Sequence, residues 1–210
     1  MSGIKKKAGH GKKSVLRHFR RHDPAIHDVL ARAEWEMLRP TEKSSGYFNR
    51  LCREIISQQL GSGAARAIVA RFRLLFPRGR ATPGRVLSLP EERLRATGMS
   101  WAKARSLRDL AARAAGREID FGKFAAADDE EVVAALVKVK GIGRWTAEMF
   151  LMFRLQRPDV LPVGDLGIVK AVQRAYRLRS VPSAKRLIRL GESWRPYRSV
   201  ACWYLWASLE

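Results

Sequence analysis

Two glycines between two apolar helical segments limit the fold of this chain more than any other feature. Apolar side chains recur at helical spacing over residues 132–137, and a second apolar segment starts at Ala147. The intervening Gly141-Ile142-Gly143 is predicted to form a tight turn, because glycine adopts positive φ and leaves room for a close neighbour. The unpaired amides and the dipole at the start of the second helix favour an anion. The predicted phosphate contacts are Lys140, Gly141, Gly143, Arg144 and Thr146.

The chain is strongly basic, with 41 Lys and Arg against 20 Asp and Glu and a net charge of +21 in 210 residues. An excess of this size favours a polyanionic partner, with nucleic acid ahead of an anionic membrane. An arginine-rich proteome would raise the same number, so charge alone leaves that alternative open. Together with the glycine turn between the two apolar segments, the charge favours nucleic acid more strongly. Residues 1–13 are predicted to be a flexible basic arm.

No segment alternates apolar and polar residues for long, which predicts an all-α fold. A hydrophobic content of 46% supports a buried core. We find no apolar run near the roughly 20 residues of a membrane span, and the basic N-terminal segment lacks the apolar stretch of a signal peptide. We therefore expect a cytoplasmic, nucleoid-associated protein without a membrane partner. Cys52 and Cys202 both lie in apolar patterns and are expected to be buried, reduced thiols rather than iron–sulfur ligands.

The sequence resembles the helix-hairpin-helix (HhH-GPD) DNA glycosylases, and within them the 3-methyladenine DNA glycosylase II (alkylpurine) branch. The resemblance rests on the hairpin, on Pro162-Val163-Gly164-Asp165 and on the segment 55–60, and it covers about residues 24–208. It implies two helical lobes flanking a DNA-binding cleft. The expected discontinuous lobe comprises residues 14–50 and 160–210. The expected middle lobe comprises residues 51–159, with the helix-hairpin-helix at about 130–155.

Asp165 is the predicted catalytic residue. An isolated aspartate before a helical segment such as 166–176 is most often an N-cap, but the resemblance assigns the family's catalytic carboxylate to this position. Both roles are compatible, because the cap geometry also fixes the carboxylate. Breaking an N-glycosidic bond builds positive charge on the deoxyribose, and a nearby carboxylate can stabilise that charge while water attacks.

Two of the six tryptophans are predicted to line a base pocket, although core packing is the ordinary role of each. Relatives that also cleave the DNA backbone carry a lysine at the position of Trp145, and its amine forms a Schiff base with the sugar. Tryptophan there implies a hydrolytic reaction that leaves an abasic site. Trp206 matches a pocket tryptophan of the branch, and an indole attracts a desolvated cationic base by ~1 to 2 kcal/mol. Met149 stands where some relatives have an aromatic residue, and completes the predicted pocket.

Gln59 matches the residue that, in this family, fills the gap left by the flipped nucleotide, with Gln58 in support. The alternative is a pair of surface glutamines that end a helix before Gly61. Further along, Lys103 and Arg105 could reach DNA or could belong to an ordinary helix start.

Family members also hold a monovalent cation through hairpin carbonyls, so the resemblance places a Na⁺ or K⁺ near Val137, Val139 and Ile142. No other cofactor is expected. The resemblance implies a monomeric, monofunctional glycosylase of base excision repair that removes alkylated purines, such as 3-methyladenine and 7-methylguanine, from duplex DNA. Two alternatives stay open: a non-catalytic binding protein for damaged DNA, and a glycosylase/lyase for oxidised bases, which Trp145 disfavours. The arginine-rich composition suggests a bacterial source.

Overall fold

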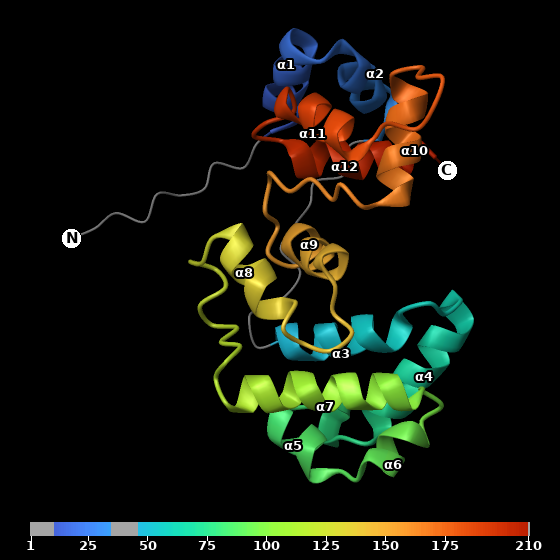
Figure 1. Cartoon of the computed structure of the whole chain (residues 1–210), viewed down its shortest axis with the longest axis vertical. Coiled ribbons are helices and arrows are strands. Elements are labelled where there is room, and N and C mark those ends of the chain that lie inside the picture. The colour runs from blue at the N-terminus through green and yellow to red at the C-terminus, as the bar shows by residue number, and fades with distance from the viewer. Residues whose placement is uncertain (1–10, 35–45, 210) are drawn as a thin grey trace, which may run out of the picture. The chain divides into compact units, whose positions relative to one another are not determined.

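A computed structural model of the chain describes residues 11–34 and 46–209, and helices are the regular elements throughout these ranges (Figure 1). The predicted all-α class is confirmed. The helices are α1 (Lys12–His22), α2 (Pro24–Arg32), α3 (Tyr47–Ser57), α4 (Ser62–Leu74), η2 (Pro77–Gly79), α5 (Pro83–Ser88), α6 (Glu91–Arg95), α7 (Trp101–Ala115), α8 (Asp129–Leu136), α9 (Arg144–Phe153), α10 (Leu166–Ala175), α11 (Ala184–Glu192) and α12 (Arg198–Ala207).

The chain divides into two compact units. Unit 1 lies within Met1–Leu38 and Arg157–Glu210, and unit 2 within Arg39–Gln156. The expected discontinuous lobe ran to residue 50, but α3 belongs as a whole to unit 2. The expected boundary at 50 therefore cut through a continuous helix. Residues 1–10 of the expected basic arm lie outside the described residues, and Lys12 and Lys13 are already part of α1.

In the described part of unit 1, α1 and α2 come from the N-terminal segment, and α10, α11 and α12 come from the C-terminal segment. Asp23 caps α2 by accepting from the Ile26 amide at 3.2 Å, and Pro24 supplies the fixed φ of the first helical position. α12 packs against both α2 and α10. The core side chains of these elements are Val15, Phe19, Ile26, Leu30, Ile168, Val172, Leu187, Trp194, Cys202 and Leu205.

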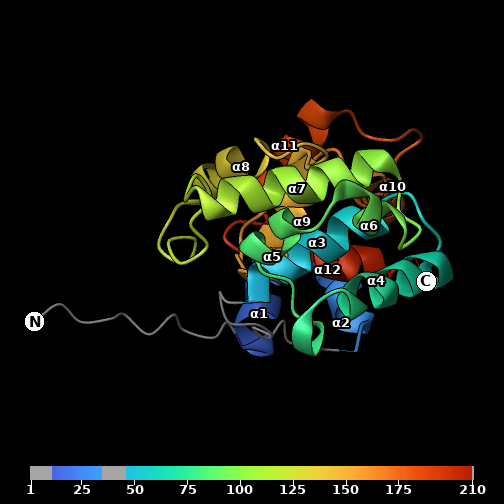
Figure 2. The same cartoon turned by 90° about the horizontal axis from the view of Figure 1, so that it is seen from below.

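Unit 2 is organised around α3 and α7, which pack against each other, while α5 and α6 lie on α7 (Figures 1 and 2). The buried face of α3 carries Leu51, Ile55 and Ile56 at helical spacing. Asp128 and Glu131 form a capping box at the start of α8, which packs on α9. The short η2 lies between α4 and α5, and Thr82 and Pro83 begin α5.

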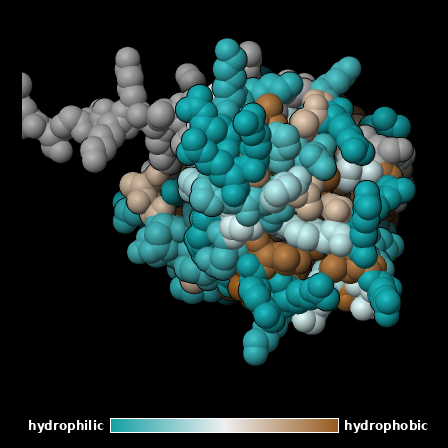
Figure 3. Space-filling model, turned by 90° about the horizontal axis from the view of Figure 1, so that it is seen from above, coloured by the Kyte–Doolittle hydropathy of each residue, from teal (hydrophilic) through white to brown (hydrophobic). Residues whose placement is uncertain are grey.

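Among the described helices none is long and apolar enough to cross a membrane. Hydrophilic side chains cover most of the face drawn in Figure 3, with hydrophobic side chains in smaller patches between them. Cys52 and Cys202 are both buried and neither forms a disulfide, as expected, and burial raises the pKa of the Cys52 thiol above its ordinary range.

Candidate active site

The predicted hairpin lies between α8 and α9 in unit 2. Gly141 has φ +82°, a left-handed conformation that favours glycine, and a Cβ at this position would lie 2.8 Å from Ser106 Oγ. The Lys140 amide donates to Asp109 Oδ2 at 2.8 Å, so a side chain of α7 binds the backbone of the turn. α9 has Gly143 as its N-cap, a residue without a side chain to accept from the first-turn amides. This geometry suits an external anion at the start of α9.

The side chains around this turn differ in how they are placed. Arg144 pairs with Glu130 and with Glu148, whose Oε1 lies 3.0 Å from the Arg144 Nε. The hydrogen bond to Glu130 is the main cause of a raised Arg144 pKa. Thr146, one of the predicted phosphate contacts, is buried. Trp145 is 48% exposed, and Met149 on the same helix is half-buried. Arg144 would have to exchange a carboxylate for a phosphate on binding DNA.

Substitution of Gly141 by alanine should damage this turn. A non-glycine residue in the left-handed region costs about 1 to 2 kcal/mol, and the contact with Ser106 adds to that. We expect a loss of about tenfold in affinity for duplex DNA, measured by fluorescence anisotropy, since tenfold corresponds to roughly 1.4 kcal/mol. Gly63→Ala is the matched control, because a Cβ there meets nothing within 4 Å. Equal affinities for the two variants would contradict the role of the turn.

The two predicted wedge residues end α3. Gln59 is exposed, lies just after the C-cap of α3 and has φ +56°, a left-handed conformation that is uncommon for a residue other than glycine. Gln58 donates from Nε2 to the Gly141 carbonyl at 2.9 Å, which ties the turn to the hairpin. Lys103 donates from Nζ to the carbonyls of Ile56 and Gln58, each at 2.8 Å. Lys103 thus closes the C-terminus of α3 and is not directed to an external partner.

Lys103→Met should lower the free energy of unfolding by about 1 to 3 kcal/mol, because it removes two charge-assisted hydrogen bonds to helix carbonyls. Desolvation already lowers the pKa of Lys103, so part of this gain is offset in the native protein. Urea denaturation measures the difference. Lys123→Met is the control, because the Lys123 side chain is 82% exposed. A Lys103→Met variant as stable as the control would show that the two carbonyl contacts contribute nothing.

The carbonyls expected to hold a monovalent cation belong to the same turn. The Val139 carbonyl accepts from the Ile142 amide at 3.0 Å, which leaves its second lone pair for an ion. Val137 follows α8 directly and is 41% exposed. The oxygen donors of this segment suit Na⁺ or K⁺ in type.

Asp165 lies in unit 1 and is the N-cap of α10, as predicted. It is 8% exposed, and its Oδ1 accepts from the Ile168 amide at 2.8 Å. The same oxygen accepts from the Trp206 indole Nε1 at 2.8 Å. Two residues that are distant in sequence are thereby brought together, and the carboxylate is held from two sides. The indole contact could not be read from the sequence.

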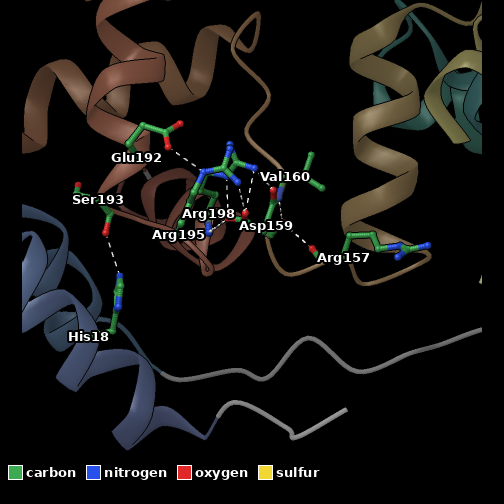
Figure 4. Close-up of polar contacts among 9 residues, drawn as sticks. His18, Arg157, Asp159, Val160, Glu192, Ser193, Arg195 and Arg198 are labelled. Carbon is green, nitrogen blue, oxygen red and sulfur yellow. Dashed lines mark hydrogen bonds and ion pairs between the residues drawn. The ribbon is translucent and has the colours of Figure 1, made fainter. Parts of the chain in front are cut away.

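The loop that leads to Asp165 is fastened to the start of α12 (Figure 4). Asp159 Oδ1 accepts from Arg198 Nε at 2.7 Å and Asp159 Oδ2 from Arg195 Nη1 at 2.8 Å. Ser199 accepts from the Val160 amide at 2.9 Å and donates to the Arg157 carbonyl at 2.6 Å. α12 therefore holds the loop before Asp165 at one end and contacts Asp165 itself through Trp206 at the other.

A surface groove of about 600 Å³ lies elsewhere on unit 1, lined by α2, α10 and α12, with Asp28, Arg174 and Tyr204 among its residues. None of the predicted site residues lines it. Of those residues, Asp165 and Trp206 belong to unit 1, whereas the hairpin, the wedge pair, Trp145 and Met149 belong to unit 2.

Unit 1 thus holds a buried carboxylate at the N-terminus of α10, and unit 2 holds a glycine turn between α8 and α9. Residues 52–196 match the model of the HhH-GPD superfamily of base excision DNA repair proteins, and the chain belongs to this family. It is 38% identical over 170 residues to DNA-3-methyladenine glycosylase 1 of Schizosaccharomyces pombe, covering 80% of this chain and 74% of that protein.

The chain is also similar to solved structures of 3-methyladenine glycosylases. A DNA-3-methyladenine glycosidase from Bacillus halodurans superposes with a TM-score of 0.84 at 32% identity, covering 92% of this chain and 88% of the other. A 3-methyladenine DNA glycosylase of S. pombe in complex with abasic DNA superposes with a TM-score of 0.75 at 30% identity, covering 92% and 95%.

Proposed function

We propose that this protein is a monofunctional DNA glycosylase of base excision repair, which removes alkylated purines such as 3-methyladenine and 7-methylguanine from duplex DNA. The observation that carries the proposal is the buried Asp165 carboxylate at the N-terminus of α10, at the position to which the sequence resemblance assigns the catalytic residue. The names of its relatives, DNA-3-methyladenine glycosylases in yeasts and bacteria, support the substrate class. We further propose that it acts as a monomer.

In the proposed reaction the hairpin amides near Gly141 and Gly143 bind phosphates beside the lesion. The damaged nucleotide leaves the stack at a cost of a few kcal/mol, and Gln59 occupies the gap, positioned by the contact of Gln58 with the hairpin. Trp145, Met149 and Trp206 receive the base. Trp145 is 48% exposed, and the face of an indole attracts a cationic purine.

The chemistry is a hydrolysis of the N-glycosidic bond. The alkylated purine carries a positive charge, so it takes the bonding electron pair and departs as a neutral base without protonation. Positive charge then develops on the deoxyribose, and the Asp165 carboxylate stabilises it. Water adds to the anomeric carbon, its proton passes to the carboxylate or to solvent, and an abasic site remains. No cofactor is needed; a Na⁺ or K⁺ at the hairpin carbonyls would serve DNA binding only.

An abasic-site assay tests the proposal against its alternatives. Methylated duplex DNA treated with the protein should break after heating in alkali and should stay intact without that step. Strand breaks before alkali, with a covalent adduct trapped by borohydride, would favour a glycosylase/lyase. Intact DNA after alkali, together with tight binding to the damaged duplex, would favour a non-catalytic damage-binding protein.

DNA binding should depend steeply on salt, because the net charge of +21 points to many phosphate contacts. Each neutralised phosphate contributes about −0.9 to the slope of log K against log salt concentration. A titration of anisotropy between low and physiological salt measures the slope. A flat response would contradict a phosphate-binding surface.

A further inference from the structure

We propose that Trp206 and Gly167 act together as positioning residues for the Asp165 carboxylate, so that Trp206 contributes to catalysis through its indole N–H and not only through its ring face. The inference rests on the proposed glycosylase function and assigns a second role to a residue expected only to line the base pocket. Gly167 has no expected role from the sequence.

The hydrogen bond defines how the indole is oriented. Trp206 Nε1 donates to Asp165 Oδ1 at 2.8 Å, the oxygen that also accepts from the Ile168 amide at 2.8 Å. Two N–H donors on one oxygen fix the carboxylate in rotation about its side-chain bonds. The pyrrole edge of the indole is thereby committed to the carboxylate, which orients the whole ring.

Gly167 makes this approach feasible. It lies in the first turn of α10, and a Cβ there would lie 2.9 Å from Trp206 Cδ1 and 3.0 Å from Trp206 Nε1. It would also lie 3.0 Å from Asp165 Oδ1. Trp206 Nε1 and Asp165 Oδ1 form the hydrogen bond, and Trp206 Cδ1 is bonded to Nε1. Any side chain at position 167 would therefore push the indole away from the carboxylate.

The backbone of α12 supports the same geometry. Arg198 and Ser199, in its first turn, bind the loop that precedes Asp165, and Trp206 contacts Asp165 from its last turn. The helix thus fixes both the approach of the chain to Asp165 and the orientation of its carboxylate. Because stabilisation of developing charge depends on a preorganised group, a loosened carboxylate should slow the chemical step more than DNA binding.

Two variants test the contribution of the Trp206 indole N–H separately from that of its aromatic ring. Trp206→Phe keeps an aromatic ring but removes the donor, and Gly167→Ala keeps the tryptophan but displaces it. Each should lower the single-turnover rate of base release by about tenfold, the effect of losing one hydrogen bond to a charged group, with little change in DNA affinity. The double variant should be no slower than the slower single variant, because both changes break the same contact. Trp203→Phe, on the same helix, is the control for rate.

The contact itself can be observed without activity. In ¹H–¹⁵N spectra the Trp206 indole resonance, identified by its loss in Trp206→Phe, should move in Gly167→Ala. It should stay in place in Gly164→Ala, since a Cβ on Gly164 meets nothing within 4 Å. An unmoved Trp206 resonance in Gly167→Ala would overturn the contact.

The kinetic outcomes are distinct from one another. Normal rates in both variants, with an active wild type, would overturn the positioning role alone. If the rate loss of the double variant equalled the product of the two single losses, the two substitutions would act independently. This result would also overturn the positioning role. Failure of the wild type to release any base would overturn the glycosylase assignment, and with it a catalytic role for the pair, whatever the spectra show.

Discussion

Asp165→Asn is expected to lower the single-turnover rate of base release by about 10³-fold while leaving DNA affinity and folding stability nearly unchanged. The charge of the carboxylate is what stabilises the sugar cation, and the amide lacks it. Asparagine is as good an N-cap as aspartate, so the hydrogen bond to the Ile168 amide is retained. The rate is measured with excess enzyme on a duplex carrying one 7-methylguanine, and affinity by anisotropy on the same duplex.

Asp128→Asn is the matched control for this substitution. Asp128 caps α8 in the same manner, through a 2.8 Å bond from the Glu131 amide, but it is exposed and belongs to a capping box. It should leave the rate of base release unaffected. Turnover retained in Asp165→Asn, or lost together with DNA binding, would contradict a catalytic role for the carboxylate.

The largest effect on stability is expected at Asp23, where alanine should lower the free energy of unfolding by about 3 to 5 kcal/mol. Asp23 is buried, and its Oδ2 accepts from Trp194 Nε1 at 3.0 Å, from Ser193 Oγ at 2.9 Å and from the Tyr176 hydroxyl. Burial, together with the bond to Asp23, raises the pKa of Tyr176. Removal of the carboxylate leaves the buried Trp194 N–H and the half-buried Ser193 and Tyr176 hydroxyls without this acceptor, and it removes the cap of α2.

At roughly 2 to 4 °C per kcal/mol, this loss corresponds to a fall in Tm of about 10 °C. Calorimetry on wild type and variant measures it directly. Asp128→Ala provides the comparison, because an exposed N-cap contributes about 1 kcal/mol. If Asp23→Ala were no less stable than Asp128→Ala, the hydrogen bonds that Asp23 accepts would not contribute strongly to the stability of unit 1.

The local features of this chain were predictable because their causes are local. The turn at Gly141 and the cap at Asp165 follow from residues a few positions apart, and the structure contains both. Helix α1 was not predicted, because only Val15 and Phe19 are buried on it and its other residues are mostly charged. A pair of apolar residues four positions apart gives a weak periodic signal.

The contacts that complete the candidate site are between segments distant in sequence. Neither the bond from Trp206 to Asp165 nor that from Gln58 to Gly141 has a signature in the spacing of residues. Lys103 could have reached DNA on its charge, yet it binds carbonyls of α3. Arg144 could have been recognised in part, since Glu148 follows it at the i,i+4 spacing of helical ion pairs.

The most direct test is chromatographic detection of free base released from methylated duplex DNA, with wild type and Asp165→Asn measured side by side. Our account predicts that the wild type releases methylpurine and that the variant, still bound to the duplex, releases almost none. No release by the wild type, or equal release by both proteins, would contradict it.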